Sequence, residues 1–263
     1  MAKTGLNKTA LITGASSGIG AALAKIHAKA GGDLILVARR ADRLEALRDD
    51  IRSAHNVNVE VIAKDLTERA AAQAIYDAVS ARGLTVNYLI NNAGFGGQGA
   101  FHTRDWAEDL SMIELNIVAL CALTRLFLPD LIARGEGRIL NVSSTASLAP
   151  GPMQAVYGAT KAFVTSFSNA IAEELRETGV TATALMPGAT ESEFAQTAGM
   201  DGTPVFQKTA SAESVATAGY RGMLRGELDV ITGLTFGQRM MVKALPITPK
   251  KTLLRQVRQM QSS

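Results

Sequence analysis

Short apolar runs rich in β-branched residues alternate with longer amphipathic stretches along most of the chain. The short runs are apolar throughout, as is typical of strands buried on both faces of a sheet. We expect strands at residues 9–13, 33–38, 58–63, 88–91, 138–143, 181–186 and 229–232. Helical periodicity occurs between them, at residues 18–30, 41–54, 67–82, 105–130, 155–178 and 212–226. This order predicts an α/β fold, a parallel sheet with helices on both faces.

The same pattern divides the chain into a body and a short extension. No Pro- or Ser-rich linker interrupts residues 1–233, which we expect to form one domain. Residues 234–263 form a basic amphipathic extension that Pro246 and Pro249 should split into two segments. Its apolar stripe predicts packing on the body or on another subunit rather than on a membrane surface. The stripe consists of Leu253, Leu254, Val257 and Met260.

The body and the extension differ in charge, and the composition of the chain argues against several classes of function. The net charge of +3 comes from 27 basic and 24 acidic residues, but residues 230–263 contain six basic residues and no acidic one. The body is therefore mildly acidic, and we expect no nucleic acid partner. No apolar run approaches the roughly 20 residues that span a bilayer, and the start does not resemble a signal peptide. Scattered histidines predict no metal site, and the single Cys121 fits a reducing, cytoplasmic setting.

A glycine cluster follows the first predicted strand. In "TGASSGIG", residues 13–20, the glycines suit a tight turn, close backbone approach to a ligand, and close packing of helix on strand. The helix that begins there offers free N–H groups and a partial positive charge, which favour a pyrophosphate. We therefore predict a dinucleotide site with contacts from Gly14, Ser16, Ser17, Gly18, Ile19 and Gly20.

The end of the second predicted strand indicates which dinucleotide binds. An NAD site places an acidic residue there to hold the ribose 2′-hydroxyl, but this chain has Ala38 followed by Arg39 and Arg40. Two guanidiniums just ahead of a helix lie at an end that is already positive. A 2′-phosphate would offset that charge, so we predict NADP(H). The simpler alternative is that both arginines point into water.

A tyrosine and a lysine stand one helical turn apart in "AVYGATKA", residues 155–162. Tyr157 and Lys161 should lie on the same face of a helix. Taken alone, the pair is better explained by a core tyrosine beside a rim lysine than by a catalytic role. The remaining motifs give it a different meaning.

Together these motifs resemble the short-chain dehydrogenase/reductase family, over almost the whole chain to about residue 233. The matching motifs are "TGASSGIG", "DL" at 65–66, "NNAG" at 91–94, Asn116 in "LNIVAL", "GRILNVSS" at 137–144, "YGATK" at 157–161 and "PG" at 187–188. The resemblance implies a Rossmann-type doubly wound sheet of seven parallel strands in the order 3-2-1-4-5-6-7. It also implies a homodimer or homotetramer formed through the helices at 105–130 and 155–178.

The resemblance assigns roles to matching residues. It implies Tyr157 as the acid/base and Lys161 as its partner and a ligand of the nicotinamide ribose. Ser144, in preference to Ser143, would orient the substrate, and Asn116 would hold a water in a proton relay. The further coenzyme contacts that it implies are Asp65, Leu66, Asn91, Asn92, Ala93, Gly94, Pro187 and Gly188.

These residues suit the interconversion of a ketone and a secondary alcohol by hydride transfer. A phenol titrates near pH 10, and burial alone raises its pKa further. A cation about 4 Å away is worth roughly 4 kcal/mol at an effective dielectric near 20, or about three pK units. We therefore expect Lys161 to bring the pKa of Tyr157 close to neutrality, while Ser144 polarises the carbonyl.

The loops expected around the substrate are mostly apolar, and none places an arginine or lysine to clamp a carboxylate. We expect an uncharged, apolar small-molecule ketone or alcohol, held by Phe95, Gln98, Met153, Gln154 and Phe194. A 3-oxoacyl reductase acting on a carrier protein or CoA is one alternative, although "NNAGFGGQGAF" lacks the polar segment usual in the carrier-protein enzymes. A non-catalytic NADP redox sensor is another, but the chain retains the tyrosine, lysine and serine that such proteins commonly lose.

Overall fold

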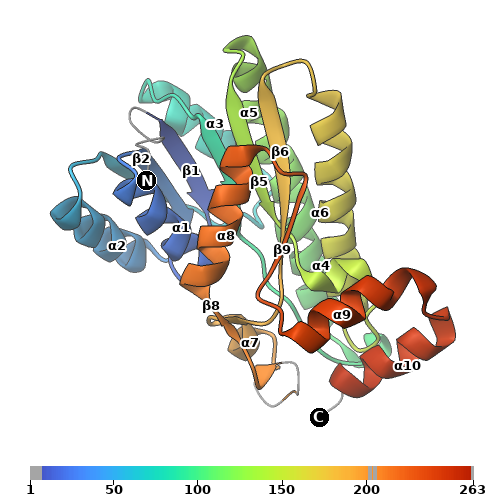
Figure 1. Ribbon diagram of the computed structural model, residues 1–263. Helices are drawn as coiled ribbons and strands as arrows, with labels where there is room; N and C mark the ends of the chain where they lie inside the picture. Colours follow the sequence, from blue (N-terminus) through green and yellow to red (C-terminus); the bar gives the residue numbers. More distant parts are fainter. Residues whose placement is uncertain (1–7, 201–202, 204–205, 262–263) are drawn as a thin grey trace.

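A seven-stranded parallel sheet forms the centre of the computed structural model, which describes residues 8–200, 203 and 206–261 (Figure 1). The strands run in the order β3-β2-β1-β4-β5-β6-β9, and every adjacent pair is parallel. Their bounds are β1 Thr9–Thr13, β2 Asp33–Ala38, β3 Val59–Ala63, β4 Tyr88–Asn91, β5 Gly137–Val142, β6 Val180–Pro187 and β9 Asp229–Thr232. The predicted doubly wound fold is confirmed, because the apolar runs are strands buried between two layers of helices.

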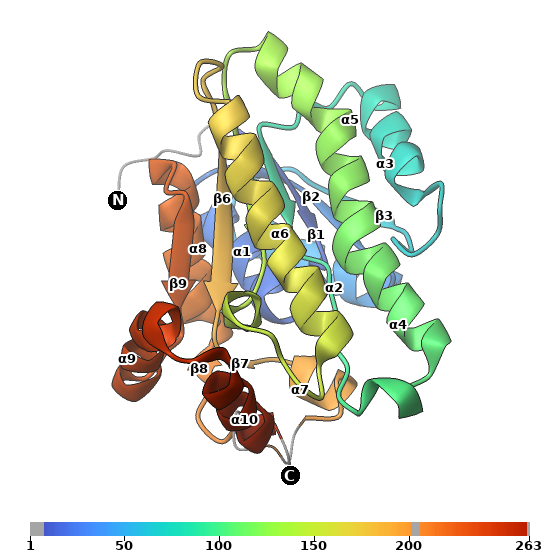
Figure 2. The ribbon, with the colours of Figure 1, turned by 90° about the vertical axis from the view of Figure 1, so that its right-hand side faces the viewer.

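Helices cover both faces of the sheet (Figure 2). One face carries α1 Gly18–Lys29, α2 Ala41–Ala54 and α8 Ala212–Arg225. The other carries α3 Ala71–Ala81, α4 Trp106–Ile113, α5 Leu120–Ala133 and α6 Ala155–Glu174. Each layer has its own buried cluster, with Leu23 and Leu44 on the first face and Phe127 and Ile171 on the second. These clusters hold the strand ends in fixed positions.

Helices α4 and α5 are joined without a break by a π-helical turn, Glu114–Ala119. The continuous helix, Trp106–Ala133, is long and apolar enough to cross a membrane by length and composition. This differs from the expectation that no segment approaches that length, because polar residues interrupt its apolar runs in the sequence. In the fold, Leu123, Phe127 and Leu131 of this helix are buried in the core cluster against the sheet. Packing on the sheet therefore accounts for its apolar face.

Short elements and the C-terminal extension gather at one end of the sheet (Figure 1). After β6, the chain forms β7 Thr190–Glu191, α7 Phe194–Thr197 and β8 Ala210–Ser211. After β9, it forms α9 Phe236–Ala244, a 3₁₀ turn at Leu245–Ile247 and α10 Lys250–Gln261. Two further 3₁₀ turns are Phe101–Thr103 and Thr145–Leu148.

The extension is divided near Pro246 and Pro249, as predicted. Leu253 and Val257 of its apolar stripe are buried on the body, and Leu254 is half-buried. The side chain of Met260 lies outside the described ones. The stripe therefore packs within this chain.

Candidate active site

A cavity of about 500 Å³ opens where the central strands end. Gly14 follows β1, Asn92 follows β4, Ser144 follows β5 and Pro187 ends β6, and all four line the cavity. In open parallel sheets, the carboxyl ends of the strands meet at one edge, where ligands bind. The fold therefore brings together motifs that are far apart in the sequence.

The glycine turn at the start of α1 forms one wall of this cavity. Gly14 has a φ of +65°, and a Cβ at this position would lie 2.8 Å from Asn92 Nδ2. Ser17, the N-cap residue of α1, makes no side-chain capping hydrogen bond, and the first turn contains no acidic residue. This helix N-terminus is therefore open to an anionic ligand, as a pyrophosphate site requires.

Two predicted coenzyme contacts, Gly20 and Asn91, lie behind the cavity lining rather than in it. A Cβ at Gly20 would lie 2.3 Å from the Gly14 carbonyl oxygen, so this glycine permits close packing of α1 on the turn. Asn91 Nδ2 donates to Thr124 Oγ1 at 3.1 Å and to Asn141 Oδ1 at 2.9 Å. Both residues hold the turn and β4 in place instead of facing the ligand.

The arginines after β2 lie at the rim of the same turn. Arg39 is largely exposed, with Nη1 3.8 Å from Asp65 Oδ2. Arg40 Nη2 donates to Ser16 Oγ at 3.0 Å and to Ser17 Oγ at 3.1 Å. The alternative in which both arginines point into water is therefore wrong for Arg40, because its guanidinium is fixed across the glycine turn. Leu66, with Asp65, lines the cavity beside them.

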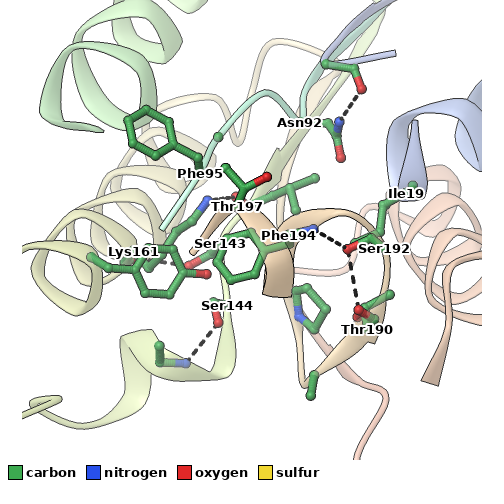
Figure 3. Close-up of a pocket in the computed structure, with 18 of the residues that line it drawn as sticks. Ile19, Asn92, Phe95, Ser143, Ser144, Lys161, Thr190, Ser192, Phe194 and Thr197 are labelled. Carbon is green, nitrogen blue, oxygen red and sulfur yellow. Dashed lines mark hydrogen bonds between the residues drawn. The ribbon is translucent and has the colours of Figure 1, made fainter. Parts of the chain in front are cut away.

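Tyr157, Lys161 and Ser144 line another wall of the cavity, and Figure 3 shows Lys161 and Ser144 on it. Tyr157 and Lys161 lie one turn apart in the first half of α6, and both are buried. Ser144 N-caps the 3₁₀ turn that follows β5, where its hydroxyl accepts from the Ala146 amide at 3.1 Å, and the same hydroxyl acts to lower the pKa of the Tyr157 phenol. Ser143, by contrast, is buried with its hydroxyl donating to the Lys161 carbonyl at 2.9 Å. The structure thus places Ser144, and not Ser143, at the phenol.

Burial has the largest influence on the titration of both the phenol and the ammonium. Lys161 Nζ lies 6.0 Å from the centre of the Tyr157 ring and donates to the Val142 carbonyl at 2.8 Å. Burial raises the pKa of Tyr157 to about 12, and only the hydrogen bond with Ser144 opposes this effect. Burial also lowers the pKa of Lys161 to about 8. Without coenzyme, the pKa of Tyr157 therefore lies above its ordinary value rather than near neutrality as the sequence led us to expect, because desolvation is the largest influence on it.

Asn116 supports the centre of the site from behind. It lies in the π-helical turn and is buried, with Nδ2 donating to the Phe95 carbonyl and to Thr160 Oγ1, each at 3.0 Å. A Cβ at Gly94 would lie 2.9 Å from Asn116 Oδ1 and 3.3 Å from Lys161 Nζ. The π turn therefore presents Asn116 next to Lys161, across the space that Gly94 leaves free. The predicted coenzyme contacts Asn92, Ala93, Gly94, Pro187 and Gly188 also line the cavity.

The predicted substrate residues divide into two groups. Phe95, Gln154 and Phe194 line the cavity, and the Phe194 ring lies 5.4 Å from the Tyr157 ring. Gln98 and Met153 lie outside the lining, which corrects the sequence prediction for both. The carbonyl of Gln98 accepts a hydrogen bond from Arg104, and that of Met153 accepts one from the Gly99 amide, so their loops turn away from the cavity.

Sequence reasoning missed two further parts of the lining. The segment after β6 contributes Thr190, Ser192, Glu193, Thr197 and Met200. The C-terminal extension contributes Leu234, Gln238, Met241, Val242, Leu245 and Val257. Four of the extension residues recur at helical spacing along α9 and its following turn, a signal that predicted a buried face but not which surface would bury it.

Comparisons with known proteins support a single family. A family model described as short chain dehydrogenase matches residues 8–201. A very-long-chain 3-oxoacyl-CoA reductase of Anas platyrhynchos is 37% identical over 190 residues, a match that covers 70% of this chain and 60% of that protein. The chain spans about three fifths of the length of such curated relatives.

Two solved structures are similar over nearly the whole chain. A short-chain dehydrogenase from Sphingobium yanoikuyae in complex with NADPH is 34% identical, with a TM-score of 0.82 over 97% of this chain and 98% of that chain. A bulky-bulky ketone specific alcohol dehydrogenase from Comamonas testosteroni is 30% identical, with a TM-score of 0.78 over 97% of each chain. The sequence comparison and the structure comparison therefore indicate the same family.

Proposed function

Because this chain belongs to the short-chain dehydrogenase family of oxidoreductases, we propose that it is an NADPH-dependent reductase that converts an uncharged, apolar ketone to a secondary alcohol. One observation carries this proposal. The Tyr157 phenol and Ser144 lie in a cavity that continues to the open N-terminus of α1. A proton donor and an anion-binding turn thus share one space.

The residues of the glycine-turn wall fit a phosphorylated dinucleotide. Gly14, Gly18 and the start of α1 would hold the pyrophosphate, and Arg39 and Arg40 would hold the 2′-phosphate. The similar Sphingobium yanoikuyae enzyme is in complex with NADPH, which supports this preference. When bound, NADPH supplies the hydride that is added to the carbonyl carbon.

Residues of the chain itself would donate the proton that the carbonyl oxygen needs. With a pKa of about 12, Tyr157 is protonated at neutral pH, so it can donate its proton to the carbonyl oxygen as the hydride reaches the carbon. The Ser144 hydroxyl, adjacent to the phenol, can orient the same oxygen. Lys161, with a pKa of about 8, is mostly charged at neutral pH and would stabilise the phenolate that remains. The protonated phenol is the form that ketone reduction requires.

The substrate class follows from the other wall of the cavity. Phe95, Phe194 and Phe206 face Met241 and Val242 of the extension across it. Apolar walls with few polar groups favour ligands of the same kind. The similar Comamonas testosteroni enzyme is specific for bulky-bulky ketones, which agrees with this lining. A 3-oxoacyl-CoA reductase is the second candidate, because relatives of that name match 70% of this chain.

A ketone panel tests the proposal. The purified protein is given NADPH or NADH at equal low concentrations with aryl ketones, hydroxysteroid-type ketones, short polar ketones and 3-oxoacyl-CoA thioesters, and absorbance of the reduced coenzyme is followed. We expect turnover with NADPH and the bulky apolar ketones. Equal turnover with NADH would contradict the coenzyme assignment, and selective turnover of the thioesters would favour the second candidate.

A homo-oligomer is part of the same proposal. Val118 on the helix at 106–133 and Phe163 on α6 are exposed at 45% and 41%. The Phe163 ring stacks on Phe167 at 6.0 Å, so α6 carries an apolar outer surface. An exposed apolar patch of this kind favours association. Light scattering should give a dimer or tetramer for the native chain, and the Phe163→Glu variant should dissociate.

A further inference from the structure

The carboxylate of Glu193 lies between two arginines at the rim of the glycine turn. Its Oε2 atom is 2.9 Å from Arg40 Nη1, and its Oε1 atom accepts a hydrogen bond from Arg43. The hydrogen bonds from Arg43 and Arg40 hold the pKa of the Glu193 carboxyl below its usual value, so the group is charged at neutral pH. The same Arg40 guanidinium is bonded to Ser16 and Ser17. A carboxylate of the chain is thus the counter-ion at the place proposed for the 2′-phosphate.

Glu193 stands between two residues that contact other parts of the site. On one side, Ser192 lies over the glycine turn, where a Cβ at Gly18 would be 3.1 Å from Ser192 Cβ. On the other side, Phe194 begins α7 and packs against Tyr157. Figure 3 shows Ser192 next to Ile19 and Phe194 beside the phenol wall. Three consecutive residues therefore touch the coenzyme turn, the arginines and the proton donor.

Phe194 restricts the space around the phenol. A Cβ at Gly96 would lie 2.6 Å from Phe194 Cζ and 3.2 Å from Tyr157 Cδ2, so the two rings and this loop are in close contact. Phe194 also stacks on Phe206, with ring centres 6.2 Å apart. Phe194 therefore occupies space beside Tyr157 that a shift of the 190–197 segment would open to a bulky ketone.

The ion pairs that hold this segment are weak ones. The side chains of Arg40, Arg43 and Glu193 are exposed at 39%, 46% and 42%. Exposed pairs contribute little because water screens them and both side chains lose rotamer freedom. A phosphate carries nearly two negative charges and three acceptor oxygens, and it suits the fork of a guanidinium. It should therefore displace a single carboxylate from the arginines, and its charge would then repel the released Glu193.

We propose that Glu193 is a coenzyme-sensing latch: it holds the 190–197 segment over Tyr157 through Arg40 and Arg43 until the 2′-phosphate of NADPH takes these arginines and frees the segment for the ketone. This inference rests on the NADP preference proposed above. It makes Glu193 a specificity-determining residue, because NADH brings no phosphate to displace the carboxylate. NADPH binds at the cost of breaking the latch, and NADH leaves the latch intact.

Binding titrations with Glu193→Gln test the competition directly. Removing the carboxylate should tighten NADPH binding by about three- to tenfold, the range expected for loss of competing exposed ion pairs. NADH affinity should change by less than about twofold. The matched control is Glu191→Gln, which removes an exposed carboxylate two residues away on β7 and should leave both affinities unchanged. Dissociation constants from coenzyme fluorescence measure this without any turnover.

Hydrogen exchange of the 190–197 amides tests the release. In the native protein, saturating NADPH should raise exchange at Phe194–Thr197, whereas saturating NADH should not. In Glu193→Gln, these amides should exchange at the faster rate before any coenzyme is added. The Glu191→Gln control should behave like the native protein.

The outcomes separate this inference from the proposed function. If native protein binds NADPH no better than NADH, the coenzyme assignment fails first. If NADPH is preferred but Glu193→Gln leaves its affinity unchanged or weaker, the latch is wrong and the reductase proposal stands. Exchange at 190–197 that responds equally to NADPH and NADH would also overturn the latch.

Discussion

The two walls of the cavity are built in different ways. The wall that carries Tyr157 and Lys161 belongs to α6 and the strand ends, and the two side chains are only 7% and 5% exposed. The wall compared with it, distinct from the glycine turn, consists of the short 190–197 segment and the C-terminal extension, where Met241 and Val242 are half-buried and Glu193 is 42% exposed. Buried, well-packed groups keep one geometry, whereas exposed segments open at low free-energy cost. The proposed proton chemistry thus lies on this rigid wall, and the proposed substrate selection lies on the other, movable wall.

The largest expected effect comes from the rigid wall. Tyr157→Phe removes the proposed proton donor but retains the ring, so kcat for ketone reduction should fall by about 10³-fold, within the range for general acid catalysis. NADPH affinity should be nearly unchanged, because the glycine turn and arginines remain. Steady-state kinetics and coenzyme titration check both statements. The matched control is Tyr76→Phe, whose phenol donates to Asp130 on the α3 side of the sheet; appreciable activity in Tyr157→Phe would remove that residue from its role.

The next effect tests the movable wall. Met241→Asp places a carboxylate in the apolar lining and should raise KM for a bulky ketone by roughly 10- to 100-fold, because burying an unpaired charge is costly. Met240→Asp, one residue away and 51% exposed, is the matched control and should have little effect. NADPH affinity should be unchanged in both variants. Equal KM values for the two variants would show that α9 does not border the substrate.

A third prediction concerns the pH dependence of the free energy of unfolding, to which the buried Lys161 of the rigid wall contributes. The pKa of Lys161 is about 8 in the folded protein and about 10.5 when unfolded, so above pH 8 the unfolded chain holds a proton that the folded chain has released. The free energy of unfolding should therefore gain about 2 kcal/mol from this group between pH 7.5 and 9.5. The raised pKa of Tyr157 adds nothing in this range, because both states keep the phenol protonated below pH 10.

Urea unfolding at the two pH values measures this contribution. The gain should be lost in Lys161→Met and retained in Lys29→Met, which removes an exposed lysine. If Lys161→Met shows the same pH dependence as the native protein, the ammonium is not desolvated as the structure indicates.

The smallest effect concerns the helix layer on the other face of the sheet, formed by α1, α2 and α8. His27 on α1 is buried and hydrogen-bonded to Tyr220 Oη at 2.8 Å and to the Lys8 carbonyl at 3.0 Å. Burial lowers its pKa below the usual 6.5, so below pH 6.5 the unfolded chain takes up a proton that the folded chain refuses. Stability should fall by no more than about 1 kcal/mol between pH 6.5 and 5.5 from this group. His27→Gln should lack this loss in urea unfolding and His102→Gln should keep it; the reverse would contradict the assignment.

The sequence was sufficient for the rigid wall because its parts are local. Strands such as β4 are continuous apolar runs, and Gly14, Ser144 and Tyr157 each stand in a short motif next to a predicted strand or helix. Contacts between residues far apart in the sequence could not be predicted from such local motifs. The pairing of Arg40 with Glu193 joins residues 153 positions apart, and no local pattern marks it. The distance between Tyr157 and Lys161 also depends on side-chain directions within the packed core, which helical spacing alone does not determine.

The C-terminal extension also shows that local sequence patterns do not predict which surfaces come into contact. Its prolines predicted two segments, and its apolar stripe predicted packing on the body or on another subunit, yet neither indicated that Met241 and Val242 of α9 would line the cavity. An amphipathic helix specifies that one face is buried, whereas the surface that buries it is set by the whole fold.

Transfer of deuterium from NADPH labelled at C4 to a bulky apolar ketone tests the central claim most directly. Mass spectrometry of the product alcohol should show one deuterium at the carbinol carbon with the native protein and almost none with Tyr157→Phe. NADPH binding without deuterium transfer to any ketone of the panel would contradict the reductase assignment and indicate a non-catalytic NADP sensor instead.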